Sequence, residues 1–142
     1  MAGLAYLDSS ALVKLVIAEA ETSALEADLA ERTGLLASGL AALECRRAVR
    51  RVSGNRQLGN VDEMLAAVVL MDITPALLET AAELDPPLLR SLDAIHVATA
   101  LAANDPNLEV ITYDDRLAAA AAANGLRVVR PGLPTFKDIG GV

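Results

Sequence analysis

Short apolar runs alternate along this chain with longer segments in which apolar residues recur every three or four positions. The short runs predict five buried strands, at residues 4–7, 35–38, 71–73, 108–112 and 126–130. The segments with helical spacing predict helices at residues 11–16, 21–32, 40–52, 61–70, 74–84, 91–102 and 116–123. This alternation is typical of an α/β protein built on a mainly parallel sheet.

The chain is long enough to bury a core as one domain, with its 142 residues. It contains no internal repeat and no linker, so we expect a single domain over residues 1–142, with an irregular tail over 131–142. Ligands of parallel sheets bind beyond the carboxyl ends of the strands. The residues that follow each predicted strand are therefore the first candidates for chemistry.

The predicted helix over residues 91–102 is small or apolar on all sides except at Asp93 and His96. A carboxylate in such surroundings requires a hydrogen-bond partner or a cation. If Ser91 caps the helix, Asp93 lies in the first turn, where the helix dipole favours negative charge. Capping and metal binding explain Asp93 equally well from this segment alone.

Three other acids occupy comparable positions. Asp8 and Asp114 follow predicted strands, and Glu44 lies beside the apolar stripe of the helix over 40–52. Together with Asp93 they form a set of carboxylates that would repel one another and raise each other's pKa. A divalent cation removes this conflict, and oxygen ligands suit Mg²⁺ or Mn²⁺ rather than zinc. The sequence therefore predicts a metal site suited to phosphoryl chemistry.

Composition narrows the class of protein further. A net charge of −7 argues against a broad basic surface for nucleic acid, but not against an enzyme that reaches nucleic acid through metal ions. Mean hydropathy is +0.40, yet no run reaches the roughly 18 uncharged apolar residues of a membrane span, and the first residues do not form a signal peptide. We expect a cytoplasmic protein without a membrane partner, with Cys45 as a small buried hydrophobe.

Four segments carry a resemblance to a known family. They are residues 6–15 around Asp8, 42–48 around Glu44, 92–100 around Asp93 and 111–117 around Asp114. In this order they resemble the PIN-domain family, and within it the VapC ribonuclease toxins of bacterial type II toxin–antitoxin pairs. The resemblance covers nearly the whole chain, and it depends on all four segments because none is specific alone.

The resemblance implies a three-layer α/β/α fold with a parallel sheet of strand order 3-2-1-4-5. It also implies a Mg²⁺- or Mn²⁺-dependent endoribonuclease, a hydrolase in which a metal-activated water cuts RNA and leaves a 3′-hydroxyl and a 5′-phosphate. The expected partners are the RNA substrate and a small cognate antitoxin that holds the toxin inactive. The expected assembly is a homodimer that forms a heterotetramer or a larger complex with the antitoxin.

Position by position, the resemblance assigns metal binding and catalysis to four acids, namely Asp8, Glu44, Asp93 and Asp114. The last of these has a neighbour, Asp115, which is an alternative ligand. The family's Thr-x-Asp motif matches Thr112 and Asp114, and this register favours Asp114 over Asp115.

Three polar residues are expected to support these acids without being catalytic themselves. Ser10 and Thr112 match hydroxyl positions of the family and are expected to orient carboxylates or phosphate. His96 belongs to the family's Asp-Ala-Ile-His pattern and lies one helical turn from Asp93. We expect it to pack or to hydrogen-bond Asp93 rather than to act as a general base, because metal-bound water needs no imidazole.

The densest basic cluster comprises Arg46, Arg47, Arg50 and Arg51. We hypothesise that Arg47 and Arg51 contact RNA phosphates beside Glu44; the alternative is a solvated helix face paired with acids. Lys14 and Arg116 are weaker candidates for RNA contacts.

Other functional classes fit the motifs less well. A receiver domain would have paired acids after the first strand and a lysine after the last, whereas this chain has Asp8 alone and Arg130. A haloacid-type phosphatase would have Asp-x-Asp where the chain has Asp8, Ser9 and Ser10. A catalytically inactive PIN-like protein that serves as a protein- or RNA-binding module remains as the alternative, although such proteins usually lose acids that are all present here.

Overall fold

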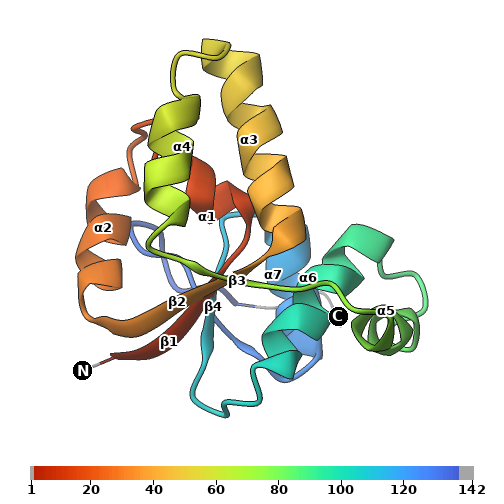
Figure 1. The fold of residues 1–142 in the computed structure, drawn as a ribbon. Coiled ribbons are helices and arrows are strands. Elements are labelled where there is room, and N and C mark those ends of the chain that lie inside the picture. The colour runs from red at the N-terminus through yellow and green to blue at the C-terminus, as the bar shows by residue number, and fades with distance from the viewer. Residues whose placement is uncertain (1, 138–142) are drawn as a thin grey trace.

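A parallel sheet of five strands forms the centre of the molecule in the computed structural model, which describes residues 2–137 (Figure 1). The strands are β1 (Ala2–Leu7), β2 (Arg32–Ser38), β3 (Val69–Met71), β4 (Glu109–Ile111) and β5 (Arg127–Val129). Their order across the sheet is β3-β2-β1-β4-β5, and every neighbouring pair is parallel. This is the predicted order 3-2-1-4-5, so the expected sheet is confirmed.

Helices cover both faces of the sheet, as expected for a three-layer fold (Figure 1). They are α1 (Ser9–Lys14), α2 (Thr22–Ala30), α3 (Gly39–Ser53), α4 (Leu58–Leu65), α5 (Pro75–Ala82), α6 (Ser91–Ala102) and α7 (Asp115–Ala123). Neighbouring strand residues point to opposite faces. Leu7 and Ile111 therefore pack with α1, α2, α3 and α4, whereas Tyr6 and Val110 pack with α6 and α7. Helix α5 packs outside α6.

Several predictions from single segments are confirmed. Helix α6 begins and ends at the predicted residues, and Cys45 is fully buried. The helix predicted from residue 74 is α5, which Thr74 caps through its side chain. The tail has no helix or strand over 131–137, and the rest of the predicted irregular tail lies outside the described residues. Within residues 2–137, no helix has the length and apolarity that a membrane crossing requires.

The boundaries around β2 and β3 differ from the predictions. The helix predicted over 21–32 ends at Ala30, and the strand predicted over 35–38 begins earlier, at Arg32, so that Gly34 lies inside β2. The third strand was predicted two residues too late, because the apolar run before Met71 extends the helical pattern of α4. Pairing with a neighbouring strand determines where β2 and β3 begin. The periodicity of apolar residues within one segment does not show which strand it will pair with.

The serines that follow the first strand, and Ser91 before Asp93, are the natural candidates for helix caps in the sequence, and none of them caps its helix. The side chain of Asp8, not a serine, caps α1 by accepting a hydrogen bond from the Ala11 N–H. Arg90 is the N-cap of α6 and makes no capping bond with its side chain, so Ser91 is the first residue of the helix. Both differences bear on the candidate site, because Asp8 and Asp93 are two of its acids.

An ion-pair network crosses the central strand β1 at its amino end. The Arg32 side chain is only 3% exposed. Its guanidinium donates hydrogen bonds of 2.9 Å to Asp28 near the end of α2 and of 2.7 Å to Glu109 on β4. It thereby connects the two strands that flank β1. Removing one partner of a buried ion pair is destabilising because the remaining charges lose their compensation.

We expect Arg32→Met to lower the free energy of unfolding by about 2 kcal/mol, a value reduced from that of a fully buried pair because both acids are partly exposed. Urea unfolding at neutral pH measures the change, and Arg127→Met on the exposed β5 serves as the control. Equal midpoints for the two variants would contradict this role of Arg32.

Candidate active site

The four predicted acids line one cavity at the carboxyl end of the sheet. The cavity has a volume of about 260 Å³, and its lining includes Asp8, Glu44, Asp93 and Asp114. We name it the catalytic pocket after the role that the family resemblance predicts for these acids. Asp8 directly follows β1, and Asp114 lies in the loop after β4. Because β1 and β4 are neighbours in the sheet, these two acids meet at one edge, and α3 and α6 bring Glu44 and Asp93 to it.

Asp8 is held in one orientation by hydrogen bonds to both carboxylate oxygens. Its Oδ1 accepts from the Ser10 hydroxyl at 2.7 Å and from the Ala11 N–H at 3.1 Å, and its Oδ2 accepts from the Thr112 hydroxyl at 2.7 Å. Burial, with 3% of the residue exposed, raises the pKa of Asp8, and the hydroxyl donors oppose that shift. Ser10 and Thr112 thus contact the carboxylate that they were expected to orient.

Asp93 has no such support. Its Oδ2 is buried and has no hydrogen-bond partner among residues 2–137. Burial and the nearby charge of Asp114 raise the pKa of Asp93. An unpartnered buried carboxylate oxygen is rare because the lost hydration is not replaced. Capping gives Asp93 no hydrogen bond here, whereas a cation in the pocket would compensate its charge.

The structure distinguishes Asp114 from its neighbour Asp115. Asp114 lines the catalytic pocket and caps α7, with its Oδ1 accepting from the Arg116 and Leu117 N–H groups at 2.8 and 3.1 Å. The Asp115 side chain is 86% exposed and pairs with the Arg130 Nη1 at 2.8 Å. The geometry therefore favours Asp114 as the fourth acid.

A buried chain of hydrogen bonds leads from the core to Glu44. The His96 Nε2 lies 2.9 Å from the Glu44 Oε1, and the His96 Nδ1 lies 2.7 Å from the Tyr6 hydroxyl. Burial raises the pKa of Tyr6, so its hydroxyl keeps the proton. When that hydroxyl donates to Nδ1, the Nε2 proton is left to donate to the Glu44 carboxylate. His96 thus contacts Glu44, not Asp93.

Sequence reasoning missed Tyr6 because it lies in an apolar run that reads as core. The available signal was its place two residues before Asp8, which puts both side chains on the same face of the strand. Arg90 was also missed. It lines the catalytic pocket together with Arg116, and its only signal was its position directly before the helix that carries Asp93.

The basic residues predicted to contact RNA have different surroundings. Arg47 and Arg51 are exposed and line a shallow hollow on α3, and Arg116 lines the catalytic pocket. Lys14 is a correction. Its ammonium is buried and pairs with Glu19 and Glu21 at 3.1 and 3.0 Å, so it is not available to a phosphate.

The donor set of the catalytic pocket fits a hard divalent cation. All candidate ligands are carboxylates, and Asp93 supplies a buried oxygen that lacks a partner among residues 2–137. Within the same residues, no three His, Cys, Asp or Glu side chains already converge closely enough to hold an ion. The residues present therefore suit Mg²⁺ or Mn²⁺ by chemistry, and the ligand geometry is not preformed.

Known proteins match this chain over most of its length. The family model of the PIN domain matches residues 5–123. Ribonuclease VapC35 of Mycobacterium tuberculosis is 45% identical over 131 residues, covering 89% of this chain and 96% of the relative. Ribonuclease VapC46 of the same organism is 39% identical over 132 residues, with the same coverage of both chains.

Solved structures agree with the fold at lower identity. The crystal structure of Mycobacterium tuberculosis VapC20, described as a sarcin-ricin loop cleaving toxin, has a TM-score of 0.70 at 18% identity and covers 89% of this chain and 99% of its own. A toxin–antitoxin complex from Klebsiella pneumoniae gives 0.68 at 23% identity, with 89% and 97% covered. The extent of the family match and the high identity to its VapC relatives show that the chain belongs to the PIN-domain family.

Proposed function

We propose that the protein is a metal-dependent endoribonuclease and the toxin of a toxin–antitoxin pair. The observation that carries this proposal is that four acids line one pocket, where one buried carboxylate oxygen has no partner among residues 2–137. The names of the similar relatives, which are ribonucleases, support the choice of RNA as the substrate. The catalytically inactive binding module stays as the alternative that the experiment tests.

The proposed metal ligands are Asp8, Glu44, Asp93 and Asp114. When bound, Mg²⁺ or Mn²⁺ would supply a Lewis acid for the phosphodiester and a lower pKa for a coordinated water. The chain's own residues supply orientation. Ser10 and Thr112 hold the two oxygens of Asp8, and His96 holds one oxygen of Glu44. No side chain is needed as a covalent nucleophile.

The proposed partners follow from the relatives rather than from the pocket. Structural neighbours were solved as a toxin–antitoxin complex and as VapBC2 from Rickettsia felis bound to a DNA fragment from their promoter. We propose a small cognate antitoxin as the protein partner of this chain, with a homodimer as the unit that it binds. The protein is proposed to act in the cytoplasm, where RNA is available.

Asp93→Asn tests the proposed role of the acids. Because the pKa of Asp93 is raised in the folded state, its contribution to stability is present below the unfolded pKa and is lost as the pH rises through the folded pKa. At neutral pH the charge therefore destabilises the metal-free fold. We expect Asp93→Asn to unfold at the same or a higher temperature, while RNA cleavage in Mg²⁺ falls by at least about 100-fold.

The assay uses purified protein freed of antitoxin and a structured RNA, with Mg²⁺ or with a chelator, alongside Asp8→Asn. A chelator should abolish cleavage by the wild type. Equal behaviour of the wild type and Asp8→Asn would reject the nuclease in favour of the binding module. An Asp93→Asn variant that fails to fold would restore the structural explanation of Asp93.

Tyr6→Phe tests the hydrogen-bond chain to Glu44. The change removes only the hydroxyl that contacts His96, so the imidazole loses the partner that fixes its proton on the Glu44 side. We expect the affinity for Mn²⁺, measured by titration calorimetry, to fall about tenfold, and cleavage to fall with it. His96→Gln, which keeps a donor for Glu44, should retain more affinity than His96→Ala. Unchanged Mn²⁺ affinity in Tyr6→Phe would show that the chain serves packing only.

Arg47 and Arg51 lie one and two helical turns beyond Glu44 on α3, and within residues 2–137 neither makes an ion pair or a side-chain hydrogen bond. Arg47→Ala combined with Arg51→Ala should weaken RNA binding and reduce the slope of log affinity against log salt by about 1.4, the value for two phosphates of a single strand. Binding is measured by fluorescence anisotropy in the Asp8→Asn background. Equal slopes for this variant and for Arg56→Ala combined with Arg127→Ala would remove the two residues from the RNA surface.

A further inference from the structure

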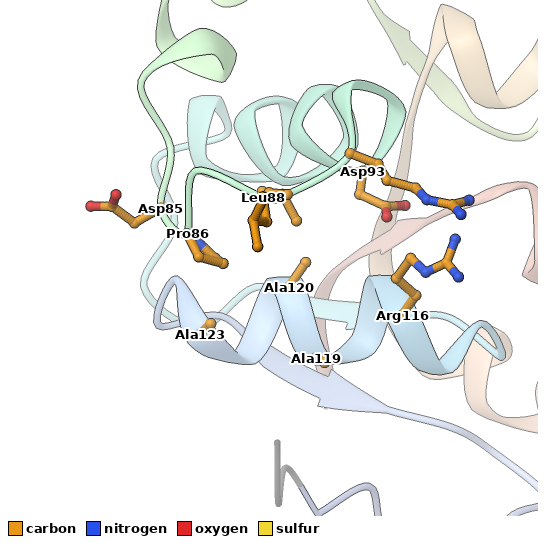
Figure 2. A pocket seen from close by; sticks show the side chains of 10 residues that line it. Asp85, Pro86, Leu88, Asp93, Arg116, Ala119, Ala120 and Ala123 are labelled. Atoms are coloured by element: carbon orange, nitrogen blue, oxygen red, sulfur yellow. The ribbon is translucent and has the colours of Figure 1, made fainter. Parts of the chain in front are cut away.

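A groove wider than the catalytic pocket continues from it between the segment before α6 and helix α7 (Figure 2). This side groove has a volume of about 700 Å³, within the range of pockets that bind small ligands. It shares Arg90, Asp93 and Arg116 with the lining of the catalytic pocket. The two cavities therefore adjoin at these three residues.

The walls of the side groove are apolar away from the shared residues. Leu88, which is 94% exposed, faces Ala120 on α7 in Figure 2, and Ala119 and Ala123 extend the α7 wall. The Asp85 side chain at the far end points away from the groove. A large apolar side chain with nearly its whole surface in solvent, in a groove rather than alone, is typical of a binding surface.

The junction between the two cavities is basic. Within residues 2–137, neither the Arg90 nor the Arg116 guanidinium forms an ion pair or a side-chain hydrogen bond. Both charges act on Asp93, whose pKa is raised by burial and Asp114 and is lowered by His96, Arg116 and Arg90. Two uncommitted guanidiniums offer the planar forks of donors that suit a phosphate.

We propose that the side groove is a nucleotide subsite for single-stranded RNA, next to the phosphodiester that is cleaved. Arg90 and Arg116 bind a backbone phosphate at the junction, and the attached sugar and base lie along the wall formed by Leu88 and α7. This inference rests on the proposed function, because it takes the catalytic pocket as the place of RNA cleavage.

Charge complementarity favours RNA over an apolar protein segment as the occupant. A protein helix would be served by the apolar walls alone, and it would leave the two guanidiniums without a role. A phosphodiester chain that leaves the catalytic pocket on the side of Arg90 and Arg116 would instead bring a phosphate to both guanidiniums, since the nucleotides on either side of the cleaved bond are linked to it. Because the protein carries a net charge of −7, which repels RNA, binding of RNA requires a local pair of cations such as Arg90 and Arg116.

Two single substitutions test the subsite in the Asp8→Asn background, in which RNA is not cut. Leu88→Asp places a negative charge on the apolar wall at a residue too exposed to affect folding, and Arg116→Ala removes one phosphate donor. Leu78→Asp on α5 and Arg127→Ala on β5 are the matched controls, because they make the same changes outside the side groove. The probe is a fluorescein-labelled single-stranded RNA of about 12 nucleotides.

We expect each groove variant to raise the dissociation constant about tenfold in fluorescence anisotropy, and Arg116→Ala to reduce the salt slope by about 0.7. The two controls should stay within about twofold of the background protein. Groove variants that bind this RNA like the controls overturn the proposal. The same result with loss of cognate antitoxin binding would assign the side groove to a protein segment and overturn it equally.

Cleavage of structured RNA by the otherwise wild-type chain is measured in parallel, so that the two proposals fail separately. If the otherwise wild-type protein cleaves RNA but the groove variants bind RNA as well as the controls do, the subsite proposal is overturned and the proposal of a nuclease stands. RNA binding that depends on the side groove, without cleavage in Mg²⁺ or Mn²⁺, supports the subsite and overturns the nuclease.

Discussion

The burial of carboxylates at the carboxyl end of the sheet is the constraint on which the rest of the structure depends. A charged group that leaves water must regain equivalent interactions, or it destabilises the fold. Asp8 regains them through three hydrogen bonds from Ser10, Ala11 and Thr112. Asp93, with a buried oxygen that has no partner among residues 2–137, does not. The molecule thus fixes one acid with its own donors and leaves a buried oxygen of another without any among the described residues.

The same constraint explains interactions that lie outside the pocket. The loop after β4 carries both Thr112 and Asp114, so its position determines two of the site's contacts. Arg130, at the end of β5, donates hydrogen bonds to the backbone carbonyls of Thr112 and Tyr113 at 3.3 and 2.9 Å. A backbone held by a guanidinium from the neighbouring strand keeps the Thr112 hydroxyl on Asp8. Arg130, which follows the edge strand β5, therefore supports Asp8, which follows the central strand β1.

The sheet order was predicted only through the resemblance to the PIN-domain family. The four acids could be singled out from the sequence itself, because they follow predicted strands or lie on or beside apolar helix faces. Contacts between distant segments could not. Arg32 lies in β2 rather than in the preceding helix because the strand pairs there with Ala2 of β1. The ammonium of Lys14 is withdrawn from solvent by its ion pairs with Glu19 and Glu21. The contact between Tyr6 and His96 joins residues 90 positions apart. Helical and strand periodicity describe how one segment faces its surroundings, and they do not report which charged or polar group it meets.

The distribution of charge along the two cavities has a consequence for the order of binding. The acids of the catalytic pocket repel the phosphates of RNA, whereas Arg90 and Arg116 at the junction attract them, and Asp93 experiences both. A divalent cation held by the acids would reverse the local sign and leave the guanidiniums free to act on a phosphate rather than on Asp93. Cation and polyanion would then each strengthen the binding of the other, since opposite charges at short range in a partly buried site are weakly screened. The carboxylate repulsion that makes the empty pocket unfavourable would thus also make the proposed RNA binding depend on the cation.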